Sequence, residues 1–237
     1  MGFILNNIGS FYEAYPFAKK AIELNPNLWE GYHNLIKILR NLKRPTDAAK
    51  YAETAIDLFS SNHLFNGLLG DIYSDTGDFD KAIFNYKQAI SKAPNDDETI
   101  YSFANFLIGT GKRKEGIDYL NKVLKVNPYH AISYYSLSTI IDVKKEKELK
   151  EKILNLEAQN FKSLEDHYTV LFSKAHIFHK LKEFDRSANF LKQGNDLKLT
   201  SKPSNIKELI KLSETIKNKT CLDTSFNKPK FNFLRDI

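Results

Sequence analysis

The feature that most constrains this chain is an internal repeat with a period of 34 residues. Pro26, Ser60, Pro94 and Pro128 lie at steps of 34, and three of these four positions hold proline. The residues before them are also alike, since 21–26 reads AIELNP and 89–94 reads AISKAP. A repeat of this length is a single supersecondary unit that cannot bury its apolar face alone. The sequence therefore predicts a solenoid of stacked units.

Each unit has the small and large residues that a pair of antiparallel helices requires. Two helices approach closely only where a small side chain stands, and large side chains fill the space beside it. The Thr76–Asp80 segment, TGDFD, has the composition of a turn between two such helices. The small positions again recur at steps of 34, at Ala14, Ala48, Ala82 and Gly116. Each unit is therefore predicted to be a helix–turn–helix.

These residues resemble the tetratricopeptide repeat (TPR) pattern over residues 1 to about 141. The resemblance implies an all-α, right-handed superhelix with a half repeat at 1–28, full repeats at 29–62, 63–96 and 97–130, and the start of a fifth at 131–141. Gly116 and Val123 depart mildly from the family, where alanine is usual. Residues 1–7 correspond to the latter half of a first helix. This indicates either a fragment or an apolar edge that is tolerated or covered by a partner.

The period fails after Asp142. Further helices are expected at about 144–157, 164–180 and 184–199, so that 142–201 forms degenerate helical repeats. A capping helix is expected at 202–218, because Pro203 precedes an amphipathic segment. Residues 219–237 are expected to be a linker. The predicted fold is thus an α-solenoid with a C-terminal helical cap.

The order of these parts resembles the N-terminal region of bacterial TPR-sulfotransferase proteins, including Phe184-Asp185 and Gly194-Asn195-Asp196 in the hairpin. In that family a catalytic domain follows, and its loop binds 3′-phosphoadenosine 5′-phosphosulfate at a helix N-terminus. No such loop occurs in these 237 residues. The resemblance implies an alternative function, in which the chain recruits substrate for a catalytic domain in a longer parent protein.

The TPR resemblance also implies a concave surface, lined by fixed positions of the first helix in each unit. An extended peptide could lie there, with Asn34 and Asn105 bonding its backbone and Tyr101 and Tyr135 packing on its side chains. The alternative is that these are ordinary solvated side chains. The Lys and Arg that would complete a carboxylate clamp are absent. The candidate groove residues are His33, Asn34, Lys37, Arg40, Asp71, Tyr101, Ser102, Asn105, Tyr135 and Thr139. We predict a scaffold for protein–protein interaction.

The net charge of +6 is unevenly distributed. Residues 1–141 hold equal numbers of basic and acidic side chains, so the excess lies in 142–237. Most of it is lysine spaced along helical segments, a pattern typical of a solvated helix face. A nucleic-acid binder usually adds arginine and aromatic residues on one face. Nucleic-acid binding is therefore the third-ranked hypothesis.

The sequence offers no catalytic motif, cofactor site or metal site. His176 and His179 lie three residues apart near His167, but no carboxylate or cysteine completes a ligand set, and we expect them to face the end of the groove. Cys221 has no partner for nucleophilic catalysis. As the single cysteine it cannot form an internal disulfide, which favours a cytoplasmic location. No apolar run approaches the roughly 18 residues of a membrane span.

Overall fold

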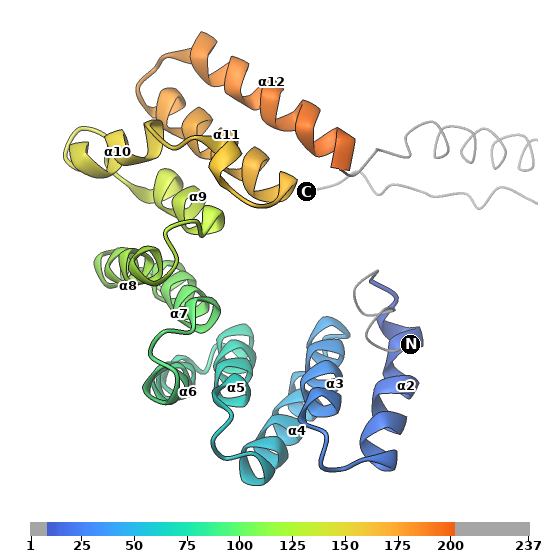
Figure 1. Ribbon diagram of the computed structural model, residues 1–237. Helices are drawn as coiled ribbons and strands as arrows, with labels where there is room; N and C mark the ends of the chain where they lie inside the picture. Colours follow the sequence, from blue (N-terminus) through green and yellow to red (C-terminus); the bar gives the residue numbers. More distant parts are fainter. Residues whose placement is uncertain (1–8, 202–237) are drawn as a thin grey trace, which may run out of the picture.

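The computed structural model describes residues 9–201, and all regular structure in that range is helical (Figure 1). The expected capping helix at 202–218, the linker at 219–237, Cys221 and residues 1–8 lie outside the described residues. None of the helices in 9–201 has the length and apolar character needed to cross a membrane. The helices are α2 (Phe11–Leu24), α3 (Trp29–Asn41), α4 (Pro45–Leu58), α5 (His63–Thr76), α6 (Phe79–Lys92), α7 (Asp97–Gly109), α8 (Arg113–Val126), α9 (Ala131–Ile140), α10 (Lys147–Leu154), the 3-10 turn η1 (Ala158–Asn160), α11 (Leu164–Lys180) and α12 (Phe184–Ser201).

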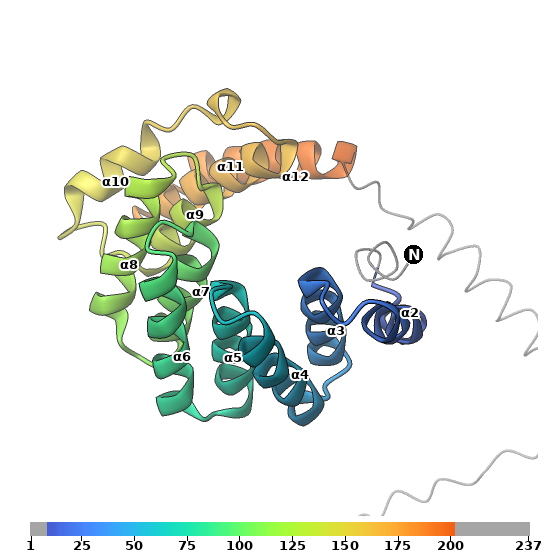
Figure 2. The ribbon, with the colours of Figure 1, turned by 60° about the horizontal axis from the view of Figure 1, so that its bottom comes forward.

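Antiparallel helix pairs stack side by side along an arc. The pairs α3–α4, α5–α6 and α7–α8 fall within 29–62, 63–96 and 97–130. Figure 2 shows α3, α5, α7 and α9 along the inner side of the arc and α4, α6 and α8 along the outer side. The inner helices α3, α5 and α7 also contact one another in sequence. The arrangement is an α-solenoid whose inner surface is built from the first helix of each pair.

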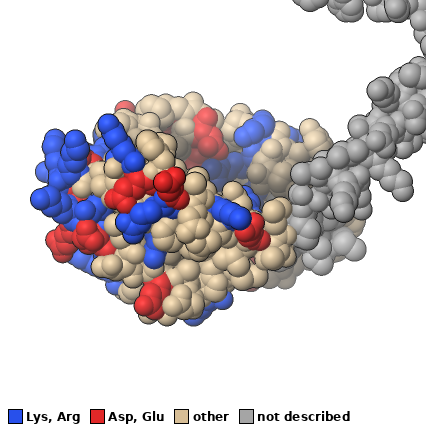
Figure 3. All heavy atoms as spheres, turned by 90° about the horizontal axis from the view of Figure 1, so that it is seen from above, with Lys and Arg blue, Asp and Glu red and all other residues tan. Residues whose placement is uncertain are grey.

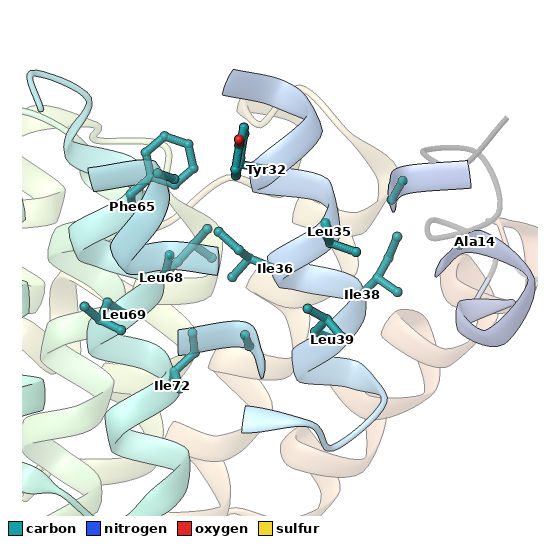
Figure 4. Close-up of a cluster of buried hydrophobic side chains, with 14 residues drawn as sticks. Ala14, Tyr32, Leu35, Ile36, Ile38, Leu39, Phe65, Leu68, Leu69 and Ile72 are labelled. Atoms are coloured by element: carbon teal, nitrogen blue, oxygen red, sulfur yellow. The ribbon is translucent and has the colours of Figure 1, made fainter. Parts of the chain in front are cut away.

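The core of the first repeats is aliphatic and continuous from one pair to the next. Leu35, Ile36, Ile38 and Leu39 of α3 are fully buried, and they pack toward α2 on one side and α5 on the other (Figure 4). Burying a side chain of this size stabilises the fold by about 1.5–3 kcal/mol relative to exposure. A single helix pair could not bury both sides of α3, which is why the units stack.

The small residues of the repeat pattern lie where the helices are closest. Ala14, Ala48 and Ala82 are fully buried. At Gly116 a Cβ atom would lie 2.5 Å from Cγ1 of Ile108 and 3.0 Å from the backbone oxygen of Ala104. The departure at Gly116 is therefore a steric requirement, because Ile108 fills the space that alanine occupies in other repeats.

The residue two positions before α2, α4, α6 and α8 has the same backbone conformation in each case. Gly9, Lys43, Gly77 and Gly111 lie at steps of 34 residues and have φ values of 82°, 58°, 82° and 84°. This left-handed conformation favours glycine, since a Cβ atom crowds the following carbonyl oxygen. Lys43 adopts it as a non-glycine residue, which the sequence pattern did not reveal.

The packing changes after Ile141. The expected helix at 144–157 is shorter, from Lys147 to Leu154, and α9 packs mainly against α11. Nζ of Lys180 donates to the backbone oxygens of Thr139 (2.8 Å) and Ile141 (2.9 Å). Nε of Arg113 donates to the oxygen of Ile140 (3.0 Å). Carbonyls at a helix C-terminus lack partners within the helix, so these two cations satisfy the end of α9.

Candidate functional site

A cleft of about 570 Å³ opens on the inner surface between α3, α5 and α7. Four of the predicted groove residues line it, namely Arg40, Asp71, Ser102 and Asn105. Asp71 and Ser102 also line a smaller cavity of about 100 Å³, together with His33. The two hollows therefore adjoin each other, and we call them together the α5–α7 cleft.

Charged groups at one wall of this cleft are already paired. Nη1 of Arg40 donates to Oδ2 of Asp71 (2.6 Å), and Nε of Arg40 donates to Oδ2 of Asp75 (2.6 Å). The hydroxyl of Tyr86, on α6, donates to the other oxygen of Asp71 (2.6 Å). These bonds join α3, α5 and α6. Arg40 and Asp71 thus hold neighbouring repeats together, in addition to lining the cleft.

Burial dominates the electrostatics of this cluster. It raises the pKa of Asp71, because the loss of solvation outweighs the attraction of Arg40 and the bond from Tyr86. Burial, with the nearby charge of Asp71, also strongly raises the pKa of Tyr86, so its hydroxyl keeps its proton and donates. For Arg40, burial opposes the charge, but the carboxylates of Asp75 and Asp71 raise its pKa.

Other polar groups that line the cleft could bind a ligand. Within residues 9–201, the hydroxyls of Ser74 and Ser102 make no hydrogen bond to the protein, and both line the cleft. Oδ1 of Asn105 accepts only a long bond from Oγ of Ser136 (3.5 Å). The hydroxyl of Tyr101 lies 3.3 Å from the same Oγ. Asn105 can therefore still donate from its amide nitrogen.

Not all predicted groove residues lie in the cleft. Tyr135 lies near α11, where its ring packs edge-on against His176 with centroids 5.2 Å apart. The hydroxyl of Thr139 donates to the backbone oxygen of Ser136 (2.7 Å), within its own helix. Lys37 lines a separate hollow beside Arg40. The cleft residues missed in the candidate list include Tyr86, whose position is alanine or leucine in neighbouring repeats and gave no signal.

The three histidines considered as metal ligands each have a different environment. His167 bonds the backbone oxygen of Phe161 (2.6 Å) through Nε2, and His179 packs against Phe184. Burial lowers the pKa of His176, and Lys180 and His179 lower it further. Within residues 9–201 no group of three or more His, Cys, Asp or Glu is arranged to hold a metal ion.

Helix pairs repeated every 34 residues around an inner cleft define a helical-repeat protein. The tetratricopeptide repeat family model matches residues 73–139, and the solenoid has the TPR fold.

Three proteins illustrate the likeness. The chain is 30% identical over 127 residues to BBSome complex member BBS4 of Bos taurus, covering 53% of this chain and 24% of that protein. PilF of Pseudomonas aeruginosa matches with a TM-score of 0.61 and 16% identity, over 90% of this chain and 94% of that one. YrrB, described as a TPR protein with an unusual peptide-binding site, matches with a TM-score of 0.52 and 15% identity, over 83% and 97%. The chain spans about a quarter of the length of the curated relatives it matches.

Proposed function

We propose that this chain is a protein-interaction scaffold that binds an extended polypeptide segment in the α5–α7 cleft. The observation that carries the proposal is the pair of hydroxyls without partners, on Ser74 and Ser102, beside the amide of Asn105. An extended peptide exposes backbone N–H and C=O groups at regular spacing, and side-chain hydroxyls and amides can bond both.

The paired charges of the cleft give the bound segment a fixed boundary. Arg40 is held by two carboxylates, so it cannot move freely toward a ligand. Phe79 and Phe106 supply apolar surface at the side of the cleft. We expect a partner whose backbone bonds Ser102 and Asn105 and whose apolar side chain packs on the phenylalanines.

The other hypotheses raised from the sequence are not tested by these observations. Recruitment of substrate for a sulfotransferase domain, with its sulfonate donor, remains a prediction about a longer parent protein. Nucleic-acid binding through the basic C-terminal part and a cytoplasmic location also remain predictions. No catalytic, cofactor or metal role is part of the proposal.

The test is a selection of peptides from a random displayed library, followed by affinity measurement with the variant Ser102→Trp. Ser102 lies on the wall shared by both hollows, so an indole there fills the cleft. We expect selected peptides to lose at least about tenfold in affinity, equivalent to 1.4 kcal/mol. The matched control is Ser91→Trp, at an exposed position of α6. Equal affinity for the two variants would refute binding in this cleft.

A further inference from the structure

A second cleft lies between the outer helices α8 and α10, away from the inner surface. It has a volume of about 450 Å³. Ile117 and Leu149 form its apolar floor, one from each helix. Lys145, Lys147 and Lys152 line it from the α10 side. We call it the α8–α10 cleft.

The α8–α10 cleft lies where the repeat is broken. The second helices α4, α6 and α8 each have 14 residues, whereas α10 has 8. The inner helix α9 packs mainly against α11, and α10 contacts both only lightly. Ile117 of α8 is only partly buried.

The lysines of this region give the cleft a basic rim. Residues 112–154 contain ten Lys and Arg but six Asp and Glu, while residues 9–111 contain ten and thirteen. Figure 3 shows Lys and Arg gathered at the side of the molecule where Figure 1 places α10, with acidic side chains among them. The basic excess of the described residues is therefore concentrated around this cleft.

The carboxylates in the α8–α10 cleft do not cancel this charge. Glu146 binds the guanidinium of Arg113 (3.2 Å) and accepts from the backbone nitrogen of Asp142 (2.5 Å). Among the described residues that line the cleft, Glu148 is then the one carboxylate whose negative charge is not paired with a cation. Lys145, Lys147 and Lys152 are exposed and outnumber it, and Lys145 makes only a long ion pair with the half-exposed Asp142 (3.9 Å). The rim can therefore attract negative charge.

We propose that the α8–α10 cleft binds an acidic amphipathic segment of a partner polypeptide. Its apolar side chains would pack on Ile117 and Leu149, and its carboxylates would approach Lys145, Lys147 and Lys152. The observations favour this ligand over nucleic acid. A phosphate backbone gains nothing from the apolar floor, and the carboxylate of Glu148 repels it. Because this cleft does not share residues with the inner one, the scaffold can hold two polypeptides at once.

The probe is a labelled helical peptide of about 15 residues built from Glu and Leu at helical spacing. We expect it to bind the wild-type chain, and the triple variant Lys145→Glu, Lys147→Glu, Lys152→Glu to bind at least about tenfold more weakly. The control variant reverses three exposed lysines outside the cleft, Lys19, Lys87 and Lys192, and so has the same net charge. Circular dichroism checks that both variants fold.

Changes to the probe separate the two kinds of contact. A Glu/Ala peptide should bind more weakly than the Glu/Leu peptide, since it cannot cover Ile117 and Leu149, and a Lys/Leu peptide should not bind. The Ser102→Trp variant should bind the Glu/Leu peptide as the wild type does, which separates this proposal from the inner cleft. Equal binding by the triple and control variants would overturn it. The proposal would also be overturned if oligothymidylate bound through the same lysines and the Glu/Leu peptide did not bind.

Discussion

The partly buried carboxylate of Asp71 gives the sharpest test of how the inner surface is held together. Its side chain is 19% exposed and accepts hydrogen bonds from Arg40 and Tyr86. Asp71→Ala removes both acceptors and leaves the Tyr86 hydroxyl without a partner. An unsatisfied buried group costs about 1–3 kcal/mol, and breaking a buried ion pair about 3–5 kcal/mol. Because Arg40 retains its ion pair with Asp75 in this variant, we expect the free energy of unfolding to fall by about 3 kcal/mol.

Asp71→Asn should cost much less. The amide oxygen can accept from Arg40, and the amide nitrogen can donate to the Tyr86 hydroxyl, so both contacts persist with the charge removed. The raised pKa of Asp71 means that its ionised form is disfavoured by burial. We therefore expect the asparagine variant to lose no more than about 1 kcal/mol at neutral pH. Asp75→Ala, at a half-exposed position, is the matched control and should cost about 0–1 kcal/mol.

The assay is urea unfolding followed by far-ultraviolet circular dichroism, with midpoints compared at a common slope. An acid whose pKa is raised by folding binds protons more tightly in the folded state, so it loses stability as pH rises from 3.8 through that raised pKa. As pH rises over this range, the free energy of unfolding of Asp71→Asn should therefore increase relative to that of the wild type. An asparagine variant as unstable as the alanine variant would show that the charge pair with Arg40 dominates, and would refute the reasoning.

Three further predictions follow from the geometry. Gly70→Ala should lower the free energy of unfolding, measured in urea, by about 1–3 kcal/mol, because the new Cβ would lie 2.9 Å from the Tyr86 ring. The control Gly109→Ala should be neutral or stabilising by up to about 1 kcal/mol, because a Cβ atom there would meet nothing within 4 Å. Lys180→Met should cost about 1–2 kcal/mol in the same assay, since two carbonyls of the α9 end lose their donor, and exposed Lys192→Met should cost nothing measurable. The lowered pKa of His176 predicts that stability falls as pH drops below 6.5, and that His176→Gln, which cannot titrate, flattens this part of the profile measured by thermal unfolding.

The 34-residue period was enough to predict the helix pairs from 29 to 130. Proline, small residues and apolar residues recur in register because the same close helix contact recurs in each unit. The expected helix at 164–180 agrees with α11, and that at 184–199 ends two residues before α12 does. The boundaries of the units as domains remain a prediction, as do the parts assigned to 1–8 and 202–237.

The candidate site was less predictable, because a groove position says where a side chain lies but not what it bonds. Arg40 and Asp71 occupy groove positions in neighbouring repeats, and they bond each other because the inner helices α3 and α5 are adjacent. Tyr86 enters the same cluster from α6, and only the folded packing shows this contact. By contrast, Ser102 and Asn105 line the cleft, and their binding of a peptide remains a prediction.

The break in the repeat at Ile141 leaves the carbonyl end of α9 to be satisfied by other helices. Arg113 from α8 and Lys180 from α11 donate to these carbonyls. The bond from Arg113 also holds Glu146 at the start of α10, which fixes one edge of the α8–α10 cleft. Arg113→Met should therefore loosen that edge, and it should lower both the affinity for the Glu/Leu peptide and the free energy of unfolding. The inner cleft shares no lining residue with the α8–α10 cleft, and Arg113 does not line it, so its peptide affinity should be unchanged.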